Sequence, residues 1–280
     1  MVFEIFIALT KGAIKMDYEG FKHEIFNMTK INLTLYKEKQ MKRRIDALIR
    51  KNNYDEYKTY VAALKTNKEL FNEFINYLTI NVSEFYRNPE QWAVLENEIF
   101  PMLLSRKKRL TIWSAACSTG DEPYTLVMVL NKFLPLNSIK ILATDIDLGA
   151  LDKAKTGVYI PKSLENLPKE FVHKYFTMLG DNYAVKSEVK NCVEFKQHNL
   201  LRDPYPTNID LIVCRNVLIY FTEEAKSEIY KNFNKSLVHQ GILFVGSTEQ
   251  LILANKYNFK SIKTFFYTKD QENFDYSALG

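Results

Sequence analysis

Hydrophobic and polar positions follow two different periods along the chain, and the change of period divides it into two parts. From Asp17 to Ile80, apolar residues recur every three or four positions, a spacing typical of amphipathic helices. The polar pairs at 52–53 and 66–67 interrupt this spacing, and the stretch contains no proline. The pattern therefore predicts a bundle of three or four short helices over residues 16–80.

Beyond residue 90, short apolar runs alternate with stretches of helical spacing. The runs predict strands at residues 110–115, 139–145, 193–198, 209–214 and 241–246. The stretches of helical spacing predict helices at residues 91–104, 121–133, 147–155 and 223–237. This alternation indicates a parallel sheet with helices on both faces, and two further runs within 257–269 suit an antiparallel end. The second domain is expected over residues 91–280, and residues 81–90 are interpreted as a linker.

One segment is longer than a connection in such a sheet requires. Residues 156–192 hold a helical run at 169–176 and strand-like runs at 182–186 and 189–194. We interpret the segment as a small inserted β-subdomain, a kind of insertion that often binds partners.

Composition narrows the class of protein. The chain has 280 residues, of which 46% are hydrophobic and 25% charged, values typical of a globular protein of two domains. The three cysteines are widely spaced and no two histidines have helical metal-ligand spacing, so we expect a reducing cytoplasm, no disulfide framework and no metal site. No apolar run reaches 18 residues, which argues against membrane insertion. Residues 1–15 are interpreted as an extension, with Met16 as the alternative start, and the net charge of +5 suggests an acidic partner.

The strongest chemical motif is SAACSTGDEPY at residues 114–124, a strand end followed by a loop of small residues and a helix start. Small residues let a ligand approach the backbone, and ligands bind at the carboxyl ends of strands in open α/β sheets. Gly120 is the single glycine, which argues against a dinucleotide pyrophosphate. Asp121 and Glu122 would repel a phosphate and attract a cation, so S-adenosylmethionine fits this loop.

Four further motifs follow the same logic. The strand at 139–145 ends in Asp145, where a carboxylate can accept hydrogen bonds from both ribose hydroxyls, while Asp147 suits a helix N-cap. The next strand is followed by Asn199 and Leu200, where an adenine would lie. The third of these, CRNVLIYF at 214–221, places Tyr220 beyond a buried strand, although core packing is a serious alternative for this tyrosine. NVSEFYR at 81–87 offers an arginine that could hold a carboxylate.

Together these motifs and FVGSTEQ at 244–250 resemble the chemotaxis receptor glutamate O-methyltransferases of the CheR family, from about Asp17 to Lys269. The resemblance implies a class I, Rossmann-like S-adenosylmethionine-dependent methyltransferase domain with an N-terminal helical domain and a small inserted β-subdomain. It also implies a cofactor site, with S-adenosylhomocysteine as the product. The implied cofactor contacts are Asn81, Ser83, Arg87, Glu122, Asp145, Asn199, Leu200, Asn216 and Val217. For the family's active-site arginine, Arg106 and Arg109 are candidates.

The substrate implied by the resemblance is a glutamate side chain on a receptor's cytoplasmic helix. A glutamate with a pKa near 4.3 is already ionised at neutral pH and needs no general base. Tyr220 could orient this carboxylate through its hydroxyl, or its ring could face the sulfonium. The basic helix at 36–51 could steer an acidic helical partner, with Lys39, Lys42, Arg43 and Arg44 facing outward. The enzyme is expected to be a monomer.

Three alternatives from other classes stay open at this point. A nicotinamide-dependent dehydrogenase shares the sheet and the ribose carboxylate but lacks the required glycines here. A nucleic-acid methyltransferase would use the basic residues for phosphates, yet residues 215–218 lack the Asn/Asp-Pro-Pro-Tyr/Phe motif. A cofactor-sensing scaffold without catalysis is the third.

Overall fold

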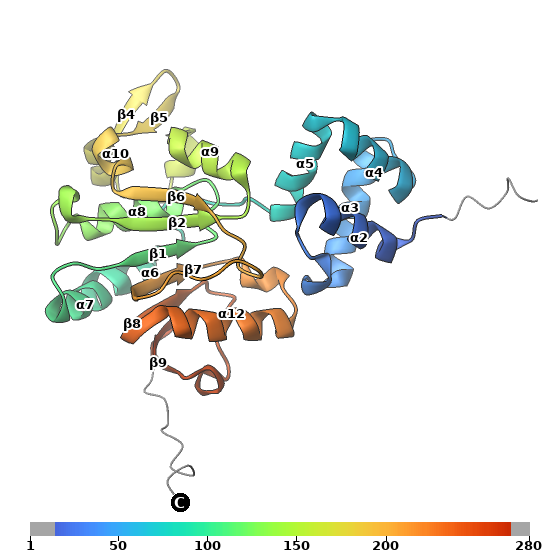
Figure 1. Ribbon diagram of the computed structural model, residues 1–280. Helices are drawn as coiled ribbons and strands as arrows, with labels where there is room; N and C mark the ends of the chain where they lie inside the picture. The colour runs from blue at the N-terminus through green and yellow to red at the C-terminus, as the bar shows by residue number, and fades with distance from the viewer. Residues whose placement is uncertain (1–14, 270–280) are drawn as a thin grey trace, which may run out of the picture. The chain divides into compact units, whose positions relative to one another are not determined.

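The computed structural model describes residues 15–269, which form parts of two compact units divided between Leu78 and Thr79 (Figure 1). The smaller unit is all helical. Its elements are α2 (Tyr18–Thr29), η1 (Leu33–Leu35), α3 (Glu38–Lys51), α4 (Tyr57–Thr66) and α5 (Lys68–Thr79). The helix ends fall at the polar pairs, because Asn52 follows α3 and Asn67 follows α4. The apolar stripes meet in a core that includes Phe21, Ile45 and Phe74.

The larger unit is built on a seven-stranded mixed sheet whose strands follow the order β6-β2-β1-β7-β8-β10-β9 (Figure 1). Its first five strands are parallel, and β10 and β9 close the sheet antiparallel. In chain order the strands are β1 (Ile112–Ala115), β2 (Ile141–Asp145), β6 (Val193–Gln197), β7 (Ile209–Cys214), β8 (Leu237–Val245), β9 (Phe259–Lys263) and β10 (Phe266–Lys269). The alternating pattern predicts the parallel part of this sheet, and the family resemblance implies its Rossmann-like class.

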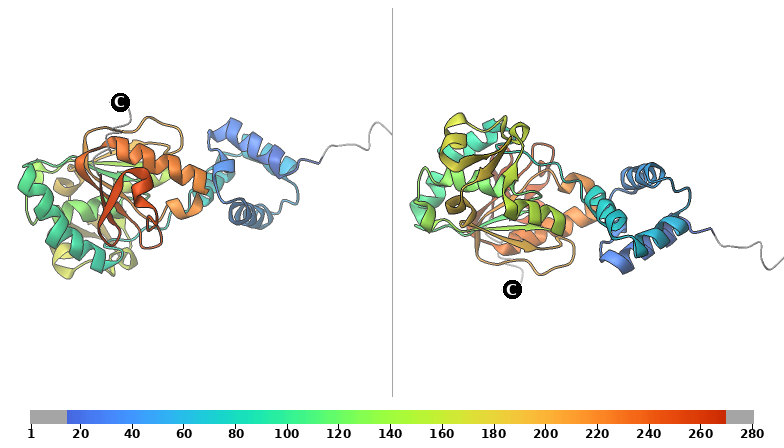
Figure 2. Two further views of the ribbon diagram at one scale, coloured as in Figure 1. Left: turned by 90° about the horizontal axis from the view of Figure 1, so that it is seen from below. Right: turned by 90° about the horizontal axis from the view of Figure 1, so that it is seen from above.

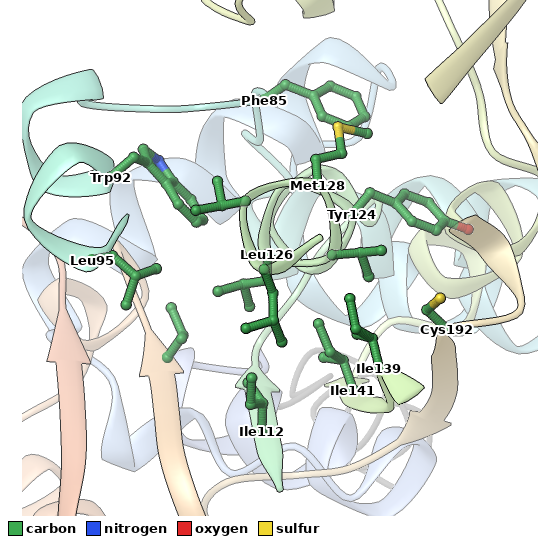
Figure 3. Close-up of a cluster of buried hydrophobic side chains, with 14 of the residues drawn as sticks. Phe85, Trp92, Leu95, Ile112, Tyr124, Leu126, Met128, Ile139, Ile141 and Cys192 are labelled. Carbon is green, nitrogen blue, oxygen red and sulfur yellow. The ribbon is translucent and has the colours of Figure 1, made fainter. Parts of the chain in front are cut away.

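Helices cover both faces of the sheet (Figure 2). On one face lie α6 (Pro89–Val94), α7 (Phe100–Arg106), α8 (Asp121–Leu130) and α9 (Leu148–Thr156). The side chains of α8 fill the centre of this core, with Trp92 and Leu95 on one side and Ile139 and Ile141 on the other (Figure 3). The other face is covered by α12 (Glu223–Ser236), whose Phe233 packs edge-on against Trp113 of β1.

Helices α6 and α7 are joined by one π-helical turn, Leu95–Ile99, in which the Phe100 N–H donates to the carbonyl of Leu95. The next residue, Pro101, has no N–H to donate. A proline inside a helix leaves a carbonyl of the preceding turn without its usual partner, and a π-turn is one way to accommodate it.

The segment between α9 and β6 forms a separate three-stranded antiparallel sheet with the order β3-β5-β4. Its elements are β3 (Val158–Tyr159), η4 (Pro161–Leu164), α10 (Lys169–Tyr175), β4 (Phe176–Leu179), β5 (Asn182–Val185) and α11 (Ser187–Lys190). The strand-like run at 189–194 is instead divided between α11 and β6. Its valines, Val189 and Val193, pack in the core from these two different elements.

Residues 81–90, interpreted from sequence as a linker, lie within the larger unit. Phe85 is completely buried and contacts the rings of Tyr159 and Phe176 edge-on. The polar residues around it therefore have fixed positions on this unit. The extension proposed at residues 1–15 lies outside the described residues except for Lys15.

Candidate active site

The carboxyl ends of the parallel strands gather the sequence motifs at one edge of the sheet, here called the carboxyl edge. Strand β1 lies between β2 and β7. The loop 116–120 directly follows β1, the segment 215–218 directly follows β7, and Asp145 is the last residue of β2. Parallel pairing therefore brings together residues that are about 100 positions apart in sequence.

The loop after β1 is held in a tight conformation. Ala116, Ser118 and Gly120 all have positive φ angles, of 61°, 49° and 91°. A Cβ on Gly120 would lie 2.8 Å from the Cβ of Ala154 in α9. This glycine is therefore required for packing of the loop against α9, and not only for the close approach of a ligand that the sequence suggested.

Asp145 fastens this loop to the end of β2. Its Oδ2 accepts a hydrogen bond from the Ser118 N–H at 2.8 Å, and its Oδ1 accepts one from the Asp147 N–H at 2.9 Å. Burial raises the pKa of Asp145 to about 6, although these backbone donors oppose the shift. Each carboxylate oxygen can accept a further hydrogen bond, so the side chain still suits a pair of ribose hydroxyls.

Asp147 forms the N-cap of α9, as its position suggested, and it also joins the segment at 79–81 to the site. Its Oδ1 accepts hydrogen bonds from the N–H groups of Gly149 and Ala150. Its Oδ2 accepts from Asn81 Nδ2 at 2.6 Å. The amide oxygen of Asn81 accepts in turn from the hydroxyl of Ser118 at 3.2 Å. Asn81 thus connects the cap to the loop, a role that sequence reasoning missed.

The first two residues of α8 place two carboxyl groups at the same edge, of which Asp121 is buried and Glu122 is 13% exposed. Asp121 accepts a hydrogen bond from Thr119 Oγ1 at 2.6 Å, and its pKa is raised by burial although a hydrogen bond with Ser83 opposes this. Glu122 accepts from Ser114 Oγ at 2.9 Å. Burial raises the pKa of Glu122 to about 6 against the opposing charge of Arg215.

Arg215 is the buried cation of the site, and sequence reasoning did not assign it a role. Its guanidinium lies 3.7 Å from Glu122 and over the rings of Trp92 and Phe244. It also donates to the backbone carbonyl of Arg87 at 2.6 Å. Arg215 therefore fixes the segment that carries Arg87 to the end of β7, while the Arg87 side chain itself remains 32% exposed.

The remaining predicted residues lie after β6 and β7. The side-chain oxygen of Asn199 accepts from the Leu201 N–H at 2.9 Å, which makes a tight turn, and Leu200 is buried. Asn216 and Val217 are partly buried, and the half-buried Tyr220 ends the 3₁₀ turn η5 (Leu218–Tyr220). All three follow β7, so they share the carboxyl edge with Asp145 and Glu122.

The candidates for an active-site arginine lie at the opposite edge of the sheet. Arg106 ends α7, and its guanidinium donates to the carbonyl of Gln240 at 3.4 Å. Arg109 is exposed and lies three residues before β1 begins. Both arginines are near the motif at 114–124 in sequence. They lie before β1 and the motif lies after it, and a strand carries the chain from one edge of the sheet to the other. Neither residue reaches the carboxyl edge.

The charges at the carboxyl edge fit a cationic ligand. The carboxyl groups of Asp121, Asp145 and Asp147 are buried there, that of Glu122 is 13% exposed, and the buried cation beside Glu122 is Arg215. A phosphate would be repelled, whereas a ligand with an ammonium and a sulfonium would supply missing positive charge. Residues 15–269 contain no cluster of histidine, cysteine and acidic residues suited to a metal ion.

An open, mostly parallel sheet with a carboxylate at the end of β2 and two more at the start of α8 fits the class I S-adenosylmethionine-dependent methyltransferases. Comparison with known families then identifies the family within this class. Residues 81–267 match the CheR methyltransferase, SAM binding domain, and residues 16–79 match the CheR methyltransferase, all-alpha domain. The chain belongs to the CheR methyltransferase family, and it is an S-adenosylmethionine-dependent methyltransferase of chemotaxis.

Named relatives agree with this assignment. A chemotaxis protein methyltransferase of Listeria monocytogenes is 40% identical over 91% of this chain and 98% of the relative. One of Borreliella burgdorferi is 34% identical over 88% of this chain and 91% of the relative. A solved Rickettsia typhi protein, PKMT2 in complex with AdoHcy, is similar over 49% of this chain and 21% of that chain, with 19% identity and a TM-score of 0.33. This structural likeness is too low to compare the two sites.

Proposed function

We propose that this protein transfers the methyl group of S-adenosylmethionine to glutamate side chains on the cytoplasmic helices of chemotaxis receptors, forming glutamyl methyl esters. The observation that carries the proposal is the presence of both CheR domains, in order, on one chain. The acidic carboxyl edge supports the choice of cofactor. We further propose that the enzyme acts in the cytoplasm as a monomer. No helix within residues 15–269 is long and apolar enough to cross a membrane.

We assign the cofactor to a continuous set of residues at the carboxyl edge. Hydrogen bonds and ion pairs already link several of them, since Ser118 joins Asp145 to Asn81, and Arg215 joins Glu122 to the segment of Arg87. The proposed contacts are Asn81, Ser83, Arg87, Glu122, Asp145, Asn199, Leu200, Asn216 and Val217. This linkage supports a preorganised site, in which binding orders few additional groups.

The chemistry requires positioning more than proton transfer. When bound, S-adenosylmethionine supplies an electrophilic methyl group. A substrate glutamate is ionised at neutral pH, so its carboxylate is already the nucleophile. The protein's task is to hold that carboxylate in line with the methyl group, which is catalysis by orientation. Tyr220 is proposed to orient it, because this half-buried side chain lies just beyond the cofactor residues Asn216 and Val217.

The basic helix α3 is proposed to dock the acidic receptor helix. Lys39, Lys42, Arg43 and Arg44 all come from it, but they differ in their contacts. Lys42 pairs with Asp46 at 3.0 Å, and Arg44 donates to the carbonyl of Tyr77 at 2.8 Å. Within residues 15–269, the side chains of Lys39 and Arg43 have neither a hydrogen bond nor an ion pair. They are the better candidates for direct contact with a partner.

Two measurements test the proposal in sequence. Calorimetric titration of wild type and Asp145→Ala with S-adenosylmethionine and S-adenosylhomocysteine should give binding that the variant loses. Transfer of a tritiated methyl group to a receptor cytoplasmic fragment should then yield a base-labile ester, as methyl esters are, and Tyr220→Phe should lower kcat. A fragment whose methylated glutamates are replaced by glutamine is the control. Cofactor binding without any transfer to the fragment would contradict the proposed substrate, and full turnover by Tyr220→Phe would remove its hydroxyl from the mechanism.

A further inference from the structure

Glu249 is a buried carboxylate that none of the site assignments above uses. It lies in the turn after β8, and the side chain folds back toward the end of the neighbouring strand β7. Only 6% of the residue is exposed. No described cation lies within ion-pair distance of it, although its charge acts on Arg215, so its direct partners are hydrogen-bond donors.

Those donors are backbone N–H groups of the segment that follows β7. Oε2 of Glu249 accepts from the Asn216 N–H at 2.5 Å, and Oε1 accepts from the Leu218 N–H at 2.6 Å. Oε2 also accepts from the Gly246 N–H at 3.0 Å, within its own turn. Burial raises the pKa of Glu249, and these N–H groups counteract that shift.

The backbone of residues 216–217 explains why a carboxylate fits there. Asn216 has a left-handed conformation with φ of 62°, and Val217 is right-handed. This alternation turns successive N–H groups toward one side and forms a concave anion-binding nest. In this protein the nest is occupied by a side chain from the neighbouring strand connection.

Gly246 is required for the same arrangement. A Cβ at this position would lie 2.6 Å from Glu249 Oε2 and 2.8 Å from the Asn216 nitrogen. Any side chain at residue 246 would therefore push the carboxylate and the segment at 216–218 apart. Glycine and glutamate in the sequence GSTE at 246–249 thus act as one unit.

We propose that Glu249 is a positioning residue that fixes the segment 216–220 at the carboxyl edge and thereby sets the geometry of the cofactor contacts at Asn216 and Val217 and of Tyr220. This inference rests on the proposed roles of those three residues. Glu249 itself touches backbone groups and acts through them. A covalent or proton-transfer role is not involved.

The test compares Glu249→Gln with wild type in S-adenosylhomocysteine titration and in methyl transfer at saturating S-adenosylmethionine. The amide retains the size of the carboxylate but sets an NH₂ group against backbone donors. We expect binding of S-adenosylhomocysteine to weaken about tenfold or more, with a lower kcat, because buried charge-assisted hydrogen bonds are lost. Glu165→Gln, an exposed glutamate in the inserted subdomain, is the matched control and should leave both unchanged.

Gly246→Ala is a second and independent way to disturb the contact between Glu249 and the segment 216–218. It should weaken binding in the same direction while Glu249 is still present. Thermal unfolding identifies the folded fraction of each variant. An affinity and a kcat within twofold of wild type in folded Glu249→Gln would overturn the proposal, even if the variant melts earlier, because that result defines a purely structural role.

The two proposals fail in different experiments. If wild type binds S-adenosylhomocysteine but methylates no receptor glutamate, the proposed substrate is wrong. If Glu249→Gln binds the same ligand as tightly as wild type does, the positioning role is wrong whatever the substrate. The titration therefore tests the positioning role of Glu249 without a receptor substrate.

Discussion

Buried carboxyl groups determine the chemistry of the carboxyl edge at the scale of single residues. Asp145 and Glu122 both have a pKa raised to about 6, with burial as the largest cause in each case. Burial that raises a carboxyl pKa this far is characteristic of functional sites. The cost of burying the ionised group is offset when a ligand of opposite charge binds. The ionised forms are the ones that a cationic cofactor stabilises.

Affinity for S-adenosylmethionine is therefore expected to fall as the pH falls below about 6. Each carboxyl group that must lose a proton on binding contributes up to about a tenfold loss per pH unit. Calorimetric titration between pH 5 and 8 measures this slope, and Asp145→Asn, if it still binds detectably, should give a shallower one because one titrating group is gone. Equal affinity from pH 5 to 8 would contradict the expectation.

Stability without ligand should change with pH in the opposite direction. The folded-state pKa of Asp145 lies above its value of about 3.9 in an unfolded chain. The folded protein therefore binds this proton more tightly, so this group's contribution to stability is complete below about pH 4 and is lost as the pH rises through about 6. At this residue acid thus stabilises the unoccupied protein against unfolding, whereas it weakens binding of the cofactor.

At the scale of elements, the loop between β1 and α8 depends on packing against α9. Gly120 has a φ of 91° and no space for a Cβ, whereas Gly180, in the β4–β5 turn, has a φ of 58° and nothing within 4 Å of its Cβ position. The same substitution at these two glycines therefore separates backbone strain from steric overlap.

Gly120→Ala should lower the free energy of unfolding more than Gly180→Ala. A left-handed conformation costs an alanine about 1–2 kcal/mol at either position. Overlap with Ala154 should add roughly 1–3 kcal/mol at residue 120 alone. Denaturant unfolding of the two variants measures the difference, and equal losses would show that α9 yields to the added methyl group without cost.

The elements of the inserted subdomain are coupled to the same loop. Tyr159 of β3 donates its hydroxyl hydrogen to the carbonyl of Thr119 at 2.6 Å, and its ring packs against Phe85. The small sheet is thus part of the support of the candidate site. Sequence alone suggested only that such an insertion often binds partners, because a hydrogen bond across 40 residues has no signature in the local pattern.

At the scale of the whole molecule, charge is unevenly distributed along the chain. The sequence of α3 contains six basic and two acidic residues. Several of these charges are neutralised internally, as in the pairs of Lys42 with Asp46 and Lys51 with Glu73. Lys39, Arg43, Arg44 and Arg50 have no such acidic partner within residues 15–269, so their charges contribute to the field that a distant acidic partner would meet.

Reversing both charges, in Lys39→Glu with Arg43→Glu, should slow receptor methylation several-fold at low salt. The effect should shrink toward none as ionic strength rises, because screening shortens the range of exposed charges. Initial rates at low and high salt measure this, with Lys58→Glu and Lys68→Glu, on α4 and α5, as a control of equal charge change. Loss of activity that is independent of salt would contradict steering, and equal rates at low salt would contradict docking on α3.

The sequence determined the helical unit, the order of strands and helices, and the set of motifs at strand ends, because hydrophobic periodicity and caps are local properties. It also indicated a cationic cofactor, since Asp121 and Glu122 adjoin the single glycine of the loop. The β-strand expected at 189–194 was wrong because apolar spacing over six residues does not distinguish one strand from a short helix followed by another strand.

Only the tertiary structure decided which side chains hold the segments of the site in position. Asn81 bonding to the cap of α9, Arg215 holding the segment of Arg87, and Glu249 filling the nest after β7 all join positions far apart in the chain. The same holds for Arg106 and Arg109, which the direction of β1 places at the edge away from the site. Contacts of this kind depend on strand order and burial, and a local pattern of residues carries neither.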